Sequence, residues 1–212
     1  MTTTKESNGF YFMILVVFIA IGYAVLRYHL LGEVPWKDFP IFILNKGVSL
    51  AGITLLSLCV SLGPLSRMGI SILATRSAKK LMGISGLLLT IAHVLLSMVI
   101  LNPRYFELFF VEDGSLSARG SLSLMAGVVS LIMLGVYHQC FKNGVVGKEK
   151  LVKFLTSNKF LLGLLLLFGA HLFFVGYHNW LVPANWIGGL PPITLVSFVM
   201  VFLAMGISLL GR

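Results

Sequence analysis

Charged side chains are scarce in this chain, and acidic ones are the scarcest. Only 11% of the 212 residues are Asp, Glu, Lys or Arg, and 58% are hydrophobic, whereas roughly 25% of a soluble domain is charged. This composition excludes an ordinary soluble domain and predicts a chain that lies in lipid. The net charge of +9 does not indicate a nucleic-acid partner, because basic residues of membrane proteins collect in cytoplasmic loops.

Cysteine pairs and nucleotide-binding motifs are also missing. Cys59 and Cys140 lie far apart, form no CxxC motif and suggest no disulfide framework, so we expect two inert buried thiols. The chain contains neither a GxGxxG motif after a strand nor a P-loop. The loops between its apolar runs are too short for a flavin or nucleotide domain.

Long apolar runs are what the chain has in abundance. A bilayer core takes about 20 mainly apolar residues per helix, and six runs approach that length: Phe10–Leu26, Phe39–Leu62, Leu81–Leu101, Ser121–Tyr137, Phe160–Tyr177 and Leu190–Leu210. The first has no clear cleavage site and is interpreted as a retained anchor. The sequence therefore predicts an all-α, six-span transmembrane bundle over residues 10–212, preceded by a cytoplasmic segment at 1–9.

The charges between these runs predict the orientation. The basic residues gather in two loops: Arg67, Arg76, Lys79 and Lys80 in one, and Lys142, Lys148, Lys150, Lys153 and Lys159 in the other, with Glu149 as the only acid. The alternate loops are balanced, acidic or uncharged, and they carry the interfacial aromatics Trp36, Tyr105, Trp180 and Trp186. The positive-inside rule then places both termini in the cytoplasm. We expect a multi-pass protein of a bacterial inner membrane, surrounded by lipid.

Two histidines lie at matched depth in this arrangement. His93 is 14 residues beyond Lys79 and His171 is 12 beyond Lys159, which puts them about 21 Å and 18 Å into the membrane. Ionisable groups at such depth are costly and usually functional. Two facing imidazoles can ligate one b-type haem iron, so we predict His93 and His171 as its axial ligands. The alternative is that each ring only hydrogen-bonds to another helix.

Three more residues were assigned to this haem site. Gly86 lies seven positions before His93 on the same helix face, with Gly83 nearby, and both could leave a slot for a flat macrocycle. Glycines are also common wherever membrane helices pack. Lys46, inside the second span, could pair with a haem propionate or could simply extend to the outer surface.

The remaining histidines lie near the ends of spans. His29 and His178 are expected to be ordinary surface residues at the outer end. His138, at the cytoplasmic end of the fourth span, could help to bind a quinone or a flavin, although an interfacial histidine is the simpler interpretation.

With these residues placed, the sequence resembles the ferric-reductase-like transmembrane family, and most of all the haem subunits of bacterial periplasmic methionine-sulfoxide reductase systems. The stretches that carry the resemblance lie within about residues 34 to 180: "VPWKDF", "LLSLCVSLGPLSR", "ATRSAKKLMGISGLLLTIAH" and "GAHLFF". The resemblance implies a six-helix bundle that passes electrons through b haem, with His93 and His171 as ligands of the outer haem.

One departure from the family pattern is informative. The family commonly carries a second histidine 13 residues before the ligand of the fifth span, where this chain has Asn158. The matching position before His93 is Lys80. The resemblance therefore implies one haem here in place of two.

The leading expectation is a haem b electron-transfer subunit of an oxidoreductase. A quinol or reduced flavin on the cytoplasmic side would be the donor, and a periplasmic reductase or metal ion the acceptor. The alternative is a haem-free structural or assembly subunit of a membrane complex that keeps a degenerate form of this fold. Transport is disfavoured, because the spans contain no acidic residue and no broken helix.

Overall fold

The computed structural model describes residues 4–70, 76–139 and 149–211 of the chain. Across these residues the regular elements are helices, without any strand. The long ones are α1 (Thr4–Val25), α2 (Leu44–Arg67), α3 (Arg76–Ile100), α4 (Ala118–Gln139), α6 (Asn158–Gly176) and α7 (Ile193–Leu210). Six of the helical segments are long and apolar enough to cross a membrane. The predicted all-α, six-span architecture is confirmed, and the protein is a multi-pass membrane protein.

Shorter elements extend or join the spans. Two π-helical turns, η1 (Leu26–Leu30) and η3 (Phe39–Ile43), lengthen the first two spans toward each other. Helix α5 (Glu149–Leu155) precedes α6 and was not predicted from the sequence. Single 3₁₀ turns form the remaining connections: η2 (Trp36–Asp38), η4 (Glu107–Phe109), η5 (Tyr177–Asn179), η6 (Pro183–Asn185) and η7 (Ile187–Gly189).

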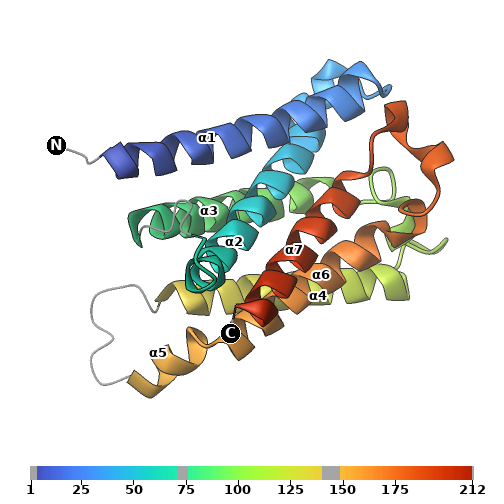
Figure 1. Ribbon diagram of the computed structural model, residues 1–212. Helices are drawn as coiled ribbons and strands as arrows, with labels where there is room; N and C mark the ends of the chain where they lie inside the picture. The colour runs from blue at the N-terminus through green and yellow to red at the C-terminus, as the bar shows by residue number, and fades with distance from the viewer. Residues whose placement is uncertain (1–3, 71–75, 140–148, 212) are drawn as a thin grey trace.

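The bundle has two parts that α7 joins. Helix α2 packs against α1, α3 and α7, while α6 packs against α4 and α7. Figure 1 shows α1, α2 and α3 in one part and α4 with α6 in the other, and α7 lying across both. Helices α3 and α6 are not among the pairs that pack closely. The helices that carry His93 and His171 are therefore held by their neighbours and not by each other.

Both ends of the chain lie at the same end of the bundle (Figure 1). That end, here called the basic end, carries Arg67, Lys79, Lys80, Lys150 and Lys153 and is the one assigned to the cytoplasm. The opposite, outer end carries the connections built from η1 to η3, η4, and η5 to η7.

Two arginines close the outer end. The buried Arg27 donates through Nη1 to the carbonyl oxygens of Ile187 and Leu190 in the connection that leads to α7. Arg119 donates to the carbonyls of Phe174 and Val175 at 2.5 and 2.7 Å. The carbonyls of Phe174 and Val175 lie in the last turn of α6, where intrahelical partners are missing. Arg119 therefore satisfies the end of α6, while Arg27 ties the end of the first span to the connection before α7.

Small residues bring the spans together, as is usual where lipid removes the hydrophobic drive between helices. The clearest case is the crossing of α2 and α3. A methyl group placed on Gly86 would lie 2.8 Å from Cγ of Leu56 and 3.2 Å from the carbonyl oxygen of Gly52. The two backbones approach so closely that only glycine fits without a shift.

We predict that Gly86→Ala lowers the free energy of unfolding in detergent by about 1–3 kcal/mol, because the added methyl overpacks this crossing. The matched control is Gly163→Ala, another glycine inside a helix, where an added methyl meets nothing within 4 Å. It should leave stability unchanged or raise it by up to about 1 kcal/mol. Denaturant titration of the two variants measures the difference, and equal effects would contradict the prediction.

Candidate functional site

His93 lies on α3, and its ring is held by α2. Nδ1 of His93 lies 2.6 Å from Oδ1 of Asn45. Asn45 is fully buried and donates through Nδ2 to the Ser97 hydroxyl, 3.0 Å away. Since an amide oxygen only accepts hydrogen bonds, the proton of His93 belongs on Nδ1. The lone pair of the ring is then on Nε2.

His171 lies on α6, and its ring is held by α4. Its Nδ1 donates to the backbone carbonyl of Ser123 at 2.9 Å, with the Ser123 hydroxyl at 3.2 Å. Gly127, one turn further along α4, leaves room for the ring, because a methyl group there would lie 3.0 Å from Nδ1. His171 therefore has the same tautomer as His93, with its lone pair on Nε2.

Neither histidine side chain is fully enclosed, because each keeps part of its surface accessible. Every hydrogen bond recorded between these rings and the described residues is made through Nδ1, so each Nε2 remains available.

Lys46 also belongs to this neighbourhood. It follows Asn45 on α2, and its charge acts on both imidazoles. Its ammonium lies 5.2 Å from the centroid of the Phe42 ring and 5.1 Å from that of Phe106, which is within cation–π range. Two aromatic rings thus hold the ammonium of Lys46. The sequence suggested a propionate partner or extension to the outer surface, and neither expectation included these rings.

The two glycines lie in different surroundings. Gly86 faces α2 at Leu56 and Gly52, so it serves the packing of α2 on α3, and its part in a slot for a macrocycle stays a prediction. Gly83 lies nearer the basic end, where an added methyl would meet the Cys59 sulfur at 3.3 Å. It lines a separate cavity in the basic half of the bundle.

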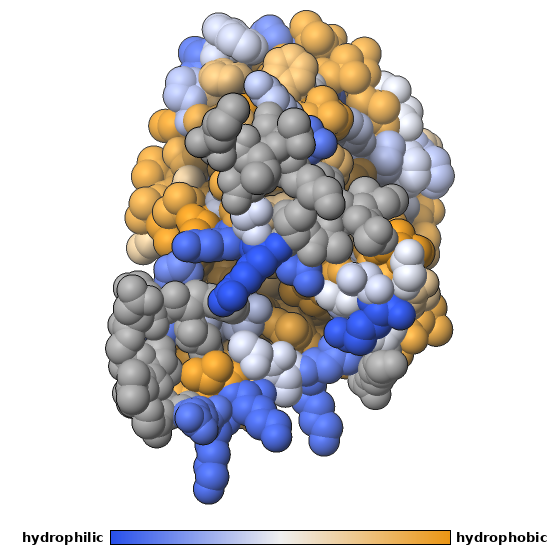
Figure 2. All heavy atoms as spheres, turned by 60° about the vertical axis from the view of Figure 1, so that its left-hand side comes forward, coloured by the Kyte–Doolittle hydropathy of each residue, from blue (hydrophilic) through white to orange (hydrophobic). Residues whose placement is uncertain are grey.

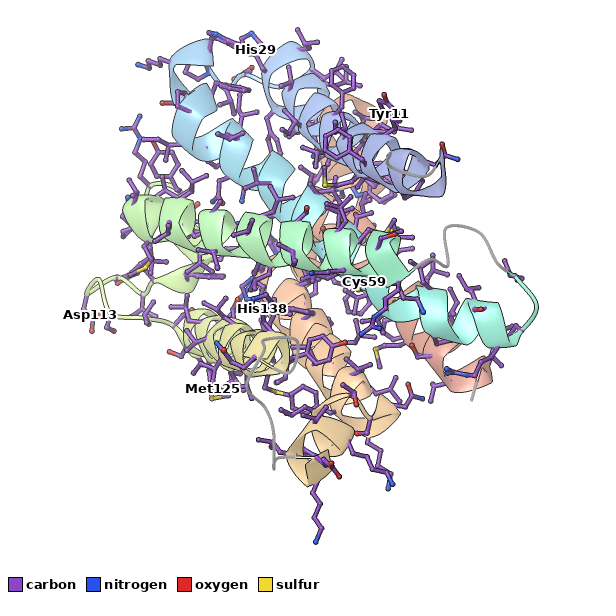
Figure 3. The ribbon with its side chains drawn as sticks, turned by 90° about the vertical axis from the view of Figure 1, so that its left-hand side faces the viewer. Tyr11, His29, Cys59, Asp113, Met125 and His138 are labelled. Atoms are coloured by element: carbon purple, nitrogen blue, oxygen red, sulfur yellow. The ribbon has the colours of Figure 1, made fainter. Side chains whose placement is uncertain are left out.

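This basic-end cavity contains the positions where the family pattern would place inner ligands. Lys80, Asn158 and His138 all line it. Asn158 donates through Nδ2 to the Ser208 carbonyl at 2.9 Å and so ties α6 to α7. Figure 3 shows His138 and Cys59 toward the middle of the bundle and His29 at its periphery.

The other sequence assignments have simple local explanations. Nδ1 of His29 is hydrogen-bonded to the Val34 carbonyl at 2.9 Å, and the exposed His178 lies 2.6 Å from Nη2 of Arg119. The Cys59 thiol donates to the Lys79 carbonyl at 3.3 Å. Cys140 lies outside the described residues.

The side chains that could act as metal ligands restrict the kind of metal centre that the bundle can hold. Among the described residues, no three His, Cys, Asp or Glu side chains come together as they would at a zinc or non-haem iron centre. Two opposed imidazoles suit a metal whose other ligands come from a macrocycle. The search of protein-family models and of curated proteins found no match to this chain.

Sequence reasoning missed Asn45, Ser123 and Gly127, which orient the two rings. Asn45 had a visible signal, because a buried amide beside Lys46 is costly in an apolar span unless it is bonded. Ser123 and Gly127 had none, because small residues occur along all membrane helices.

We predict that both rings are neutral with the proton on Nδ1 when the protein is free of bound metal. Asn45→Leu removes the acceptor for His93 and should convert its ring to a mixture of tautomers, while the His171 ring stays unchanged. NMR of ¹⁵N-histidine-labelled protein measures this. Ser49→Ala is the control, because the Ser49 hydroxyl bonds only the Lys46 carbonyl. A proton on Nε2 of either ring in the wild type would contradict the assignment.

Proposed function

We propose that this protein is a membrane electron-transfer subunit that holds one b-type haem between His93 and His171, as in the ferric-reductase-like transmembrane family. One observation carries the proposal. Two imidazoles on separate helices have their Nδ1 atoms bonded to the protein, and no hydrogen bond to a described residue occupies either Nε2 atom. A purely structural histidine would be expected to use both nitrogens, since an unsatisfied polar atom in an apolar interior is costly.

The surrounding residues fit such a ligand pair. Metal-binding histidines usually donate their other N–H to a carbonyl or carboxylate, which fixes the tautomer and the ring orientation. The Asn45 amide oxygen and the Ser123 carbonyl have that role here. Helix α3 is held mainly by α2, and α6 by α4 and α7, so the helix that carries each proposed ligand is positioned by its own neighbours.

Each residue of the site then has a distinct role. When bound, the haem would supply a one-electron couple whose potential depends on its axial ligands and on the polarity around it. His93 and His171 would hold the iron, and Asn45 and Ser123 would keep the two rings oriented. The Lys46 ammonium, held between Phe42 and Phe106, would attract an anionic propionate.

The orientation suggests the direction of electron flow. We propose an inner-membrane location in bacteria, with a quinol or flavin as the donor on the cytoplasmic side. A periplasmic reductase or a metal ion would be the acceptor. The site lies in the half of the bundle nearer the outer end, and the loop of residues 102–117 is the candidate docking surface there. The described chain is almost entirely membrane helix, so we propose that partner proteins carry the substrate chemistry.

The test is a reduced-minus-oxidised absorption spectrum of protein purified from haem-replete cells. We expect a b-type α-band in the wild type that His93→Ala and His171→Ala each abolish. His138→Ala is the matched control, because this histidine also lies inside the bundle but lines the other cavity, and it should keep the band. Added imidazole should restore the band in His93→Gly.

Two results would contradict the proposal. One is a colourless wild type at full expression, which would favour the haem-free assembly subunit. The other is equal loss of the band in His138→Ala and His93→Ala.

A further inference from the structure

A second cavity lies in the basic half of the bundle, between α2, α3, α4 and α6. Its volume is about 660 Å³, within the range of small-molecule sites. It ends toward the middle of the membrane at Leu87 and Phe168, below the level of His93 and His171. Figure 2 looks onto this side of the molecule, where hydrophilic side chains gather around a hollow with hydrophobic residues inside.

The wall of this cavity has two chemically different parts. Its deep part is apolar and is built by Leu56, Leu87, Leu134, Leu164, Leu165 and Phe168. The part nearer the basic end carries Arg67, Arg76, Lys79 and Lys80. No described residue in the lining is acidic. A ligand that matches both parts needs an apolar body and an anionic head.

Two of the cations converge on one point. A methyl group placed on Gly63 would lie 3.6 Å from Nζ of Lys79 and 3.8 Å from Nη1 of Arg67. Two like charges beside the same small residue repel each other unless an anion lies between them. Arg67 is additionally fixed by its Nε, which donates to the Gly211 carbonyl at 2.7 Å. This arrangement is a preformed site for an anion at the mouth of the cavity.

The positive charge of the cavity mouth favours an anionic amphiphile over a neutral one. A neutral quinone headgroup would bring no counter-charge to these four cations. The cytoplasmic leaflet is rich in anionic lipids, and basic pockets between membrane helices bind their headgroups. An acyl chain can occupy the apolar part of the cavity, since lipid tails are as apolar as its leucines.

We propose that this cavity binds an anionic phospholipid of the cytoplasmic leaflet. The headgroup phosphate lies between Lys79 and Arg67, and an acyl chain extends along the apolar wall toward Leu87 and Phe168. This site is separate from the histidine pair and does not depend on haem binding.

The experiment measures the thermal unfolding midpoint of the full-length protein in mixed micelles, because a ligand that binds only the native state raises the midpoint as its concentration exceeds its dissociation constant. Dioleoylphosphatidylglycerol is compared with dioleoylphosphatidylcholine, which has the same acyl chains without net charge. We expect the anionic lipid to bind at least tenfold more tightly. Lys79→Gln combined with Lys80→Gln should weaken it by about 25-fold, since each cation near an anionic lipid contributes about 1 kcal/mol.

The matched control also removes two positive charges from the basic end of the molecule, but at positions outside the cavity. Lys150→Gln combined with Lys153→Gln changes two lysines of α5 that do not line the cavity, and binding should stay within about twofold, because charge away from the lipid contributes little. Gly63→Leu keeps every charge but fills the point between Lys79 and Arg67, and it should abolish the preference for the anionic lipid. This variant separates a specific site from a general effect of charge.

Three results would overturn the proposal. Equal stabilisation by the two lipids would show that no anion is recognised. Equal weakening by the α5 control would indicate attraction to the whole basic surface. Full stabilisation by inorganic phosphate alone would show a free-anion site without an acyl chain. None of these outcomes affects the spectrum that tests the haem proposal.

Discussion

An imidazole in the core of a bilayer has no water to bond, and this constraint shapes the centre of the molecule. Each ring nitrogen must find a partner in the protein or in a ligand. For His93 and His171 the protein supplies one partner each, the Asn45 amide and the Ser123 carbonyl. Both bonds use Nδ1, so Nε2 of each ring is left for a further partner. The proposed haem is the group that satisfies both nitrogens at once.

The helix packing follows from the same requirement. Helices α3 and α6 belong to different parts of the bundle, and their neighbours α2, α4 and α7 hold them apart. Close packing occurs at the crossing of α2 and α3, where Gly86 meets Leu56. Lys46 is held by two aromatic rings. The inner half contains a cavity with a cationic mouth.

The sequence was sufficient to predict the all-α, six-span fold. Apolar runs and loop charges predicted six spans, because bilayer thickness limits helix length and basic loops have one preferred side. Helix rise alone placed His93 and His171 at similar heights. Which faces of the helices meet could not be predicted, because small residues occur on several faces of each span. Gly86 was assigned to the haem slot for that reason, although it packs against α2. The role of Asn45 required the crossing of α2 and α3 to be known.

The inner half contains the positions where the family resemblance would place further ligands. Lys80 and Asn158 occupy the places where the family resemblance would put histidines, and the cavity around them holds four cations and His138. One haem at the outer site is therefore the central claim. The ratio of haem to polypeptide in the purified protein, measured together with the electron paramagnetic resonance spectrum of the oxidised form, tests it most directly. The account predicts one low-spin haem with two histidine ligands per chain. Two haems per chain, or none, would contradict it.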